Sequence, residues 1–140
     1  MSYTQINFEK IDNVARIILN RPQKKNALDT EIVSEIGDAV EEIAGDPTIK
    51  ALILTGAGEA FSSGGDVDML INDLCLRSST EIREILKKFY GRGAVSLRSL
   101  EIPVIGAING PALGAGFDLS LHCDMRIASE GAKFGSIWVR

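Results

Sequence analysis

Two glycine-bearing loops carry the residue types that could do chemistry in this sequence. One contains Gly64-Gly65-Asp66, and the other contains Gly114-Ala115-Gly116 with Asp118 shortly after it. Each loop can present a free backbone N–H, and two such donors form an oxyanion hole, which stabilises negative charge developing on a carbonyl oxygen. Glycine suits both loops because the backbone must approach a ligand closely. A carboxylate at Asp118 would stand beside that anion.

Other interpretations of these loops remain open or are excluded. Glycine turns before helices are common, so each loop alone is also typical of ordinary loop geometry. Asp118 could serve as a cap that the helix dipole favours. A dinucleotide-binding domain is a third hypothesis, but the G-x-G-x-x-G fingerprint is missing near the first strand. A phosphate-binding P-loop is excluded because no Gly-Lys-Ser/Thr follows.

Alternating strands and helices must position these two loops. The pattern predicts a β-hairpin from Tyr3–Glu9 and Val14–Leu19, and a helix from Asp29 or Thr30 to Ala44 that stops at Gly45. Further strands are predicted over residues 51–54, 103–108 and 124–128. The order β-β-α-β-α-β-α-β indicates an α/β fold with parallel pairing, in which both loops leave the carboxyl ends of their strands side by side.

Two helices are expected between the glycine loops, and a third after the second loop. Residues 67–76 form a short one, and Ser78 with Glu81 makes a capping box for the next. A break is expected at residues 91–93, and a later helix at 114–122. The longer helix is expected to bury Ile82, Ile85, Leu86, Phe89 and Leu97.

Composition narrows the class of protein. The chain has 140 residues, 45% hydrophobic and 24% charged, which suits one domain with one core. A net charge of −4 argues against nucleic-acid binding. No apolar run approaches the roughly 20 residues that span a membrane. The N-terminus is polar and carries no signal peptide. Cys75 and Cys123 are expected as reduced and buried thiols of a cytoplasmic protein, with Cys123 and His122 in packing roles. With one histidine, no metal site is expected.

Several motifs in the expected order resemble the crotonase (enoyl-CoA hydratase/isomerase) superfamily over the whole chain. The residues that carry the resemblance are Asn20-Arg21-Pro22 with Lys25-Asn26-Ala27-Leu28, Ala51 to Gly56, Ala60 to Asp66, Ile102 to Leu119, Cys123 to Ala128, and Lys133-Phe134-Gly135.

The resemblance implies an acyl-CoA thioester substrate, in fatty acid metabolism, with no cofactor apart from the coenzyme A that the substrate carries. Gly65 and Ala115 match the two oxyanion donors, although the family usually has glycine at the second. Asp118 matches the first catalytic glutamate and is one methylene shorter. Leu70 and Trp138 are assigned to the acyl pocket. The residues assigned to coenzyme A binding are Lys25, Ala27, Leu28, Ala60, Ser62, Ser63, Gly64, Asp66, Val67 and Asp68.

Trp138 is a departure from the family pattern. Hydratases have a second glutamate three residues after Phe134-Gly135, and hydration usually needs two carboxylates that share the acid and base roles. The prediction is therefore an acyl-CoA hydratase or isomerase that uses Asp118, with hydration itself in doubt. The alternative is a non-catalytic acyl-CoA-binding or oligomerisation fragment. Trp138 could also be core.

Some charged residues of the first loops have alternatives as well. Lys24 and Lys25 could belong to a solvated loop, and Asp66 and Asp68 could shape the loop or face the adenine.

The implied fold is the crotonase-type α/β spiral of β-β-α units, as one domain over residues 1–140. Its C-terminal helices are expected to be missing, because the sequence stops within an apolar stretch. The family assembles as homotrimers or hexamers.

Overall fold

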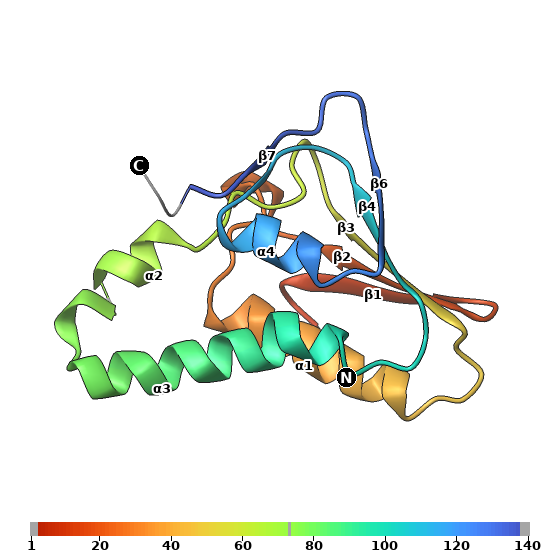
Figure 1. Cartoon of the computed structure of the whole chain (residues 1–140), viewed down its shortest axis with the longest axis horizontal. Helices are drawn as coiled ribbons and strands as arrows, with labels where there is room; N and C mark the ends of the chain where they lie inside the picture. Colours follow the sequence, from red (N-terminus) through yellow and green to blue (C-terminus); the bar gives the residue numbers. More distant parts are fainter. Residues whose placement is uncertain (1–2, 73, 138–140) are drawn as a thin grey trace.

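A five-stranded sheet organises the computed structural model, which describes residues 3–72 and 74–137 (Figure 1). Trp138, assigned to the acyl pocket, therefore lies outside the described residues. The strand order is β1-β2-β3-β4-β6, with β1 antiparallel to β2 and the other neighbours parallel. This confirms the predicted hairpin and the parallel α/β sheet. The strands are β1 (Ile6–Ile11), β2 (Val14–Leu19), β3 (Ala51–Gly56), β4 (Val104–Ile108) and β6 (Met125–Ala128).

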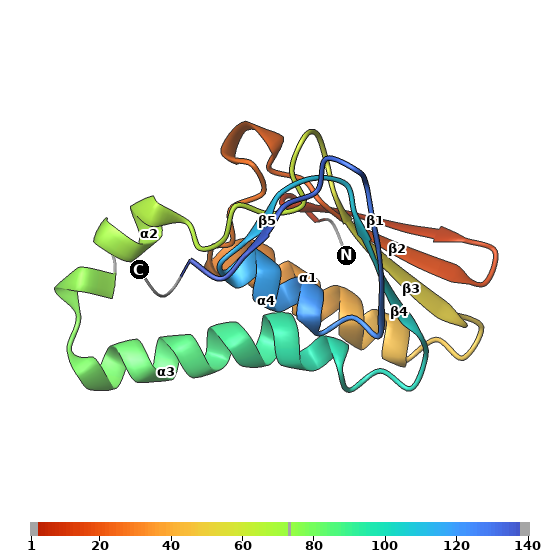
Figure 2. The same ribbon diagram turned by 45° about the horizontal axis from the view of Figure 1, so that its top comes forward.

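The core lies on one face of this sheet. Buried residues alternate along β2, β3 and β4, as strand geometry requires when one face is covered. The register pairs Ile17 with Leu54, and Leu54 with Gly106. Helix α1 (Thr30–Ala44) packs against β1 and β2. Figures 1 and 2 show α1 and α4 (Ala115–Leu121) on one side of the sheet, with α3 beyond them.

Helix α1 forms where its capping residues and apolar spacing predict it. The Asp29 side chain accepts hydrogen bonds from the backbone N–H groups of Glu31 and Ile32, and Gly45 ends the helix. The apolar residues recur at helical spacing, so one face of α1 is buried against the sheet. That face consists of Ile32, Val33, Ile36, Val40 and Ile43.

A second, small sheet was not predicted. It pairs β5 (Ala112–Leu113) in parallel with β7 (Phe134–Gly135). Isolated bridges join Leu28 to Gly65 and Ser62 to Ala112, so the small sheet continues into the first glycine loop. We call residues 24–28, 60–66 and 111–116 the loop stack. A short 3-10 turn over Pro22–Lys24 leads into it.

Helices α2 (Val67–Asn72) and α3 (Ser79–Tyr90) form a helical arm, which Figure 2 shows projecting away from the sheet. A separate 3-10 turn over Leu74–Leu76 breaks the helix predicted for 67–76. The predicted capping box is confirmed, because Ser78 accepts from Glu81 N while the Glu81 carboxylate accepts from Ser78 N.

The predicted break in this helix is confirmed as a π-helical turn, η3 (Gly91–Val95). The predicted burial is partly wrong. Phe89 and Leu97 are buried, but Ile82 and Ile85 are only half-buried and Leu86 is exposed. The reason is that α1 lies against the C-terminal part of this segment, whereas its N-terminal part extends past the sheet (Figure 2).

Candidate functional site

The two glycine loops lie side by side, as their places after parallel strands predicted. Leu113 N donates to Ser62 O at 2.9 Å, and the N–H groups of Phe61 and Ser62 both donate to Pro111 O at 3.1 Å. A Cβ atom added to Gly116 would stand 2.6 Å from Ser62 Cβ, which is closer than real side chains approach. Only glycine at position 116 allows the loops to pack this closely.

Backbone hydrogen bonds hold Gly65 on both sides. Leu28 N donates to Gly64 O at 2.7 Å, and Asp66 N donates to Leu28 O at 2.8 Å. Gly64 itself has φ of 105°, a left-handed conformation that favours glycine. A Cβ added to Gly64 would stand 3.6 Å from Ala115 N, so the loops meet beside both candidate donors. Within residues 3–72 and 74–137, the N–H groups of Gly65 and Ala115 donate to none of the loop acceptors.

Two asparagine side chains that the sequence analysis missed hold the first loop from either side. Asn26 is fully buried, and its amide donates to Ala57 O at 2.9 Å and to Ala60 O at 2.8 Å. The Asn109 amide donates to Gly58 O at 3.0 Å and to Ala60 O at 3.3 Å. Asn109 also accepts from Gly56 N at 3.1 Å. Both asparagines lie in segments that carry the family resemblance, but no sequence signal assigned their side chains to Ala60.

A buried ion pair fixes the first loop to the preceding segment. Arg21 is 8% exposed, and its guanidinium lies 3.0 Å from Asp66 Oδ2 and 2.9 Å from Asp29 Oδ2. The same guanidinium donates to Ala27 O at 2.7 Å. Asp66 in turn accepts from Asp68 N at 3.0 Å and so begins α2. Arg21 therefore connects the α1 cap to the residue that follows Gly65.

Lys24 extends this network to the surface. Its Nζ lies 2.8 Å from Asp68 Oδ2 and 3.3 Å from Asp66 Oδ2, and these hydrogen bonds raise the pKa of Lys24. Burial works to raise the pKa of Asp66, but hydrogen bonds from Arg21 and Lys24 outweigh it, so the pKa of Asp66 is lowered below 3.8. These contacts are of the kind that a loop-shaping role for Asp66 and Asp68 requires, and Lys24 forms ion pairs with both.

The residues assigned to coenzyme A binding divide into a buried group and an exposed group. The Ser62 hydroxyl is used within the protein, since it donates to Asn26 O at 2.8 Å and accepts from Gly64 N at 3.2 Å. Ser63 is half-buried. The exposed residues are Lys25, Val67 and Asp68. The buried residues are Ala27, Leu28, Ala60, Ser62, Gly64 and Asp66.

Asp118 and Leu70 come from the helices that follow the two glycine loops. Asp118 is half-buried in the first turn of α4, and its backbone oxygen lies 2.8 Å from His122 Nδ1. Leu70 Cδ1 would lie 3.5 Å from a Cβ added to Gly65. Cys123 is buried, and burial raises the pKa of its thiol to about 11, which agrees with the predicted packing role. The expected burial of Cys75 is wrong, because it lies exposed in the 3-10 turn between α2 and α3.

Between residues 3–72 and 74–137, no three His, Cys, Asp or Glu side chains are grouped in a way that could hold a metal ion. No helix described in the structure combines the length and the apolar character that crossing a membrane requires.

Comparison with known proteins places this geometry in a family. Residues 9–139 match the family model described as enoyl-CoA hydratase/isomerase. The chain is 38% identical to a crotonyl-CoA hydratase of Syntrophomonas wolfei, over 96% of this chain and 50% of that protein. It is 34% identical to a 4-chlorobenzoyl coenzyme A dehalogenase of an Arthrobacter species, over 96% of this chain and 48% of that protein.

Solved structures agree with the sequence relatives. The crystal structure of an enoyl-CoA hydratase/isomerase from Xanthobacter autotrophicus superposes with a TM-score of 0.87 at 38% identity, covering 96% of this chain and 49% of the other. The predicted α/β fold class is therefore confirmed. The chain spans about half the length of the curated relatives it matches.

Proposed function

We propose, from the fact that this chain belongs to the enoyl-CoA hydratase/isomerase family, that it binds an acyl-CoA thioester in an oxyanion hole. The thioester oxygen accepts hydrogen bonds from the N–H groups of Gly65 and Ala115. The observation that carries the proposal is the meeting of two glycine loops whose candidate donors are used by no described loop acceptor.

Rigidity of the donors supports this assignment. An oxyanion hole lowers a barrier because its dipoles are already oriented before charge develops. The hydrogen bonds through Leu28 fix the peptide groups on both sides of Gly65, and Ala115 is 4% exposed at the start of α4. Ala115 keeps the N–H that glycine would supply, and its methyl group narrows the site. Removing one such donor typically costs about 3–4 kcal/mol of transition-state stabilisation.

The chemistry that follows is proton transfer at the carbon next to the thioester carbonyl. Hydrogen bonds to the carbonyl oxygen stabilise the enolate, in which the electron pair of the broken C–H bond is delocalised onto that oxygen. Asp118 accepts the proton and can return it to the same or a conjugated carbon. One carboxylate is enough for such an isomerisation, and hydration has less support because position 138 is Trp. The relatives include a hydratase and a dehalogenase, so family membership leaves the reaction open.

Exchange of α-protons with solvent tests the hole directly. The protein is incubated with butyryl-CoA in D₂O, and deuterium incorporation is followed by NMR. Gly65→Pro removes the N–H and should slow exchange by about 100-fold or more. Gly65→Ala keeps the N–H, and its Cβ meets Leu70 at 3.5 Å, an ordinary contact, so it should retain exchange. The proposal fails if Gly65→Pro, shown to be folded by its unfolding midpoint, exchanges as fast as wild type.

Asp118→Asn separates proton transfer from binding. This variant should bind butyryl-CoA with unchanged affinity but show no exchange. A second candidate function, acyl-CoA binding without catalysis, is favoured by Trp138 in place of the expected glutamate. Wild-type protein that binds butyryl-CoA but exchanges no deuterium would support that second function over the first.

Other properties of the protein stay predictions. We propose that it needs no cofactor apart from the substrate's coenzyme A, that it works in the cytoplasm, and that it assembles as a homotrimer or hexamer. Sedimentation analysis at several protein concentrations measures the last of these.

A further inference from the structure

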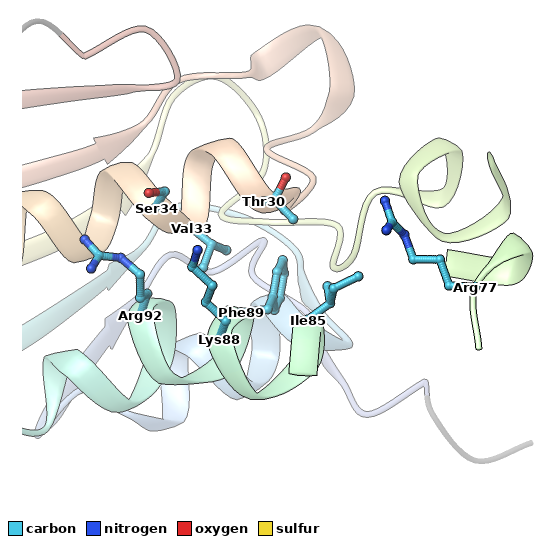
Figure 3. Close-up of a pocket in the computed structure, with 8 residues that line it drawn as sticks. All are labelled: Thr30, Val33, Ser34, Arg77, Ile85, Lys88, Phe89 and Arg92. Atoms are coloured by element: carbon cyan, nitrogen blue, oxygen red, sulfur yellow. The ribbon is translucent and has the colours of Figure 1, made fainter. Parts of the chain in front are cut away.

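A cavity of about 330 Å³ lies between α1 and α3, outside the loop stack (Figure 3). Val33, Ile85 and Phe89 give it an apolar wall, and Lys88 and Arg92 give it a basic one. None of the described residues that line it is acidic. Figure 3 shows Ile85, Lys88, Phe89 and Arg92 rising from the α3 side toward α1.

Lys88 is the cation of this cavity that is available to a ligand. Arg92 is already paired with Asp38 and, at 3.2 Å, with Glu41. Arg77 has an interaction of its own. Lys88 makes no ion pair with any residue in 3–72 or 74–137, whereas its neighbour Lys87 lies 3.2 Å from Glu84. The cavity thus joins an apolar wall to one uncompensated ammonium group.

A second, much smaller gap adjoins this cavity and is lined in part by Ala115, one of the two proposed donors. The gap has a volume of about 10 Å³, and its lining includes Ala115 and Leu28 on one side. Val33 and Phe89 line both the gap and the cavity. Because the gap is about the size of one water molecule, the Phe89 ring must move before an acyl chain can pass. Phe89 and Lys88 both line the cavity, so an acyl chain that passed the ring would enter the space beside Lys88.

We propose that the cavity holds the distal end of an acyl group that carries a terminal carboxylate, and that Lys88 pairs with this carboxylate. The substrate class is then a dicarboxylic acid joined through one end to coenzyme A. This inference rests on the proposed function, because the proposed hole fixes where the acyl chain begins.

The phosphates of coenzyme A share the same chemistry and are the competing occupant. The apolar wall favours the acyl group, since Val33, Phe89 and Ile85 offer a methylene chain contacts that a phosphate cannot use. The gap lined by Ala115 also adjoins the cavity, so movement of the Phe89 ring would open a path for the acyl group.

Binding of two matched thioesters tests the inference. Adipyl-CoA and hexanoyl-CoA have acyl chains of equal carbon number and differ by the terminal carboxylate, and both can be titrated calorimetrically into the protein. Wild type should bind adipyl-CoA about two- to fivefold more tightly, the range of a solvent-exposed ion pair. Lys88→Met should remove this preference, and Lys88→Arg should keep it. The control Lys87→Met, one residue away and already paired with Glu84, should leave it unchanged.

Each other outcome overturns the inference in a recognisable way. If wild type binds both thioesters with equal affinity, the cavity does not recognise the terminal carboxylate, while the proposed function stands. If Lys88→Met weakens both thioesters equally, Lys88 contacts coenzyme A instead. If neither thioester binds to wild type, the inference and the proposed function fail together.

Discussion

The loop stack and the helical arm differ in how their positions are fixed. The segments of the loop stack are held to one another by backbone hydrogen bonds, two asparagine amides and the Arg21–Asp66 ion pair. In the arm, α2 has no buried residue and Leu86 of α3 is exposed. Segments with few buried contacts open locally at lower free energy than the core does.

This difference assigns separate tasks to the two regions. Donors that stabilise a developing charge must not reorganise, and the proposed donors lie in the loop stack. Lys88, which we propose pairs with the substrate carboxylate, lies exposed on the arm. The neighbouring Phe89 ring is buried, and it must move to admit the acyl group. If the arm proved as rigid as the loop stack, the two regions would not differ in this way.

Breaking the buried ion pair should have the largest effect. Arg21→Met leaves Asp66, which is 4% exposed, without its main partner, and should lower the free energy of unfolding by about 3 kcal/mol. Lys24 still contacts Asp66, which keeps the loss at the lower end of the usual range. Denaturation in urea measures it. Arg16→Met removes the surface pair with Glu9 and should cost less than about 1 kcal/mol. Equal losses in the two variants would show that the stack does not depend on Arg21.

The same substitution should have opposite signs in the two regions. Gly116→Ala puts a methyl group 2.6 Å from Ser62 and should destabilise the protein by about 1–3 kcal/mol. At Gly91, which follows α3 with φ of −61°, an added Cβ meets nothing within 4 Å. Gly91→Ala should therefore stabilise by about 0.4–1 kcal/mol. Thermal unfolding of both variants measures the difference, and a stabilised Gly116→Ala would contradict the close packing of the loops.

Acid should weaken the loop stack by the smallest amount, because burial of Asp66 offsets part of the hydrogen bonding that lowers its pKa. A carboxyl with a lowered folded-state pKa contributes stability above its unfolded value and loses it as the pH falls through the folded value. The advantage of wild type over Asp66→Asn should thus be constant near neutral pH and shrink below pH 3.8. Urea titrations at a series of pH values measure this. An advantage that grew in acid would reverse the sign and refute the assigned partners.

Much of the fold could be predicted from local sequence chemistry. The Asp29 cap, the Ser78–Glu81 box and the apolar spacing of α1 each depend on residues a few positions apart. Burial on α3 could not be predicted in the same way, because spacing shows which residues share a face but not what covers that face. Leu86 shares its spacing with Phe89 and yet is exposed, at a surface hollow whose lining residues all come from α3 itself.

The candidate site was predicted unevenly for the same reason. The two glycine loops could be singled out because parallel strands bring the loops at their carboxyl ends together, whereas Gly65 and Ala115 themselves were assigned through the family resemblance. Arg21 and Asp66 are 45 positions apart, and no local rule pairs them. Asn26 and Asn109 reach Ala60 from opposite directions in the chain, and only the folded arrangement brings them together.

The sequence by itself determined the strands of the main sheet, the principal helices and their order, and the two loops that carry the candidate donors. These follow from hydrophobic period, caps and turns, which act over a few residues, and the motifs along the chain indicated the family. The tertiary structure alone decided which side chains fix the loops of those donors and which face of α3 is covered. It also placed Phe89 between Ala115 and the cavity that Lys88 lines. Such features depend on packing between distant segments, whose contacts exist only after the chain has folded.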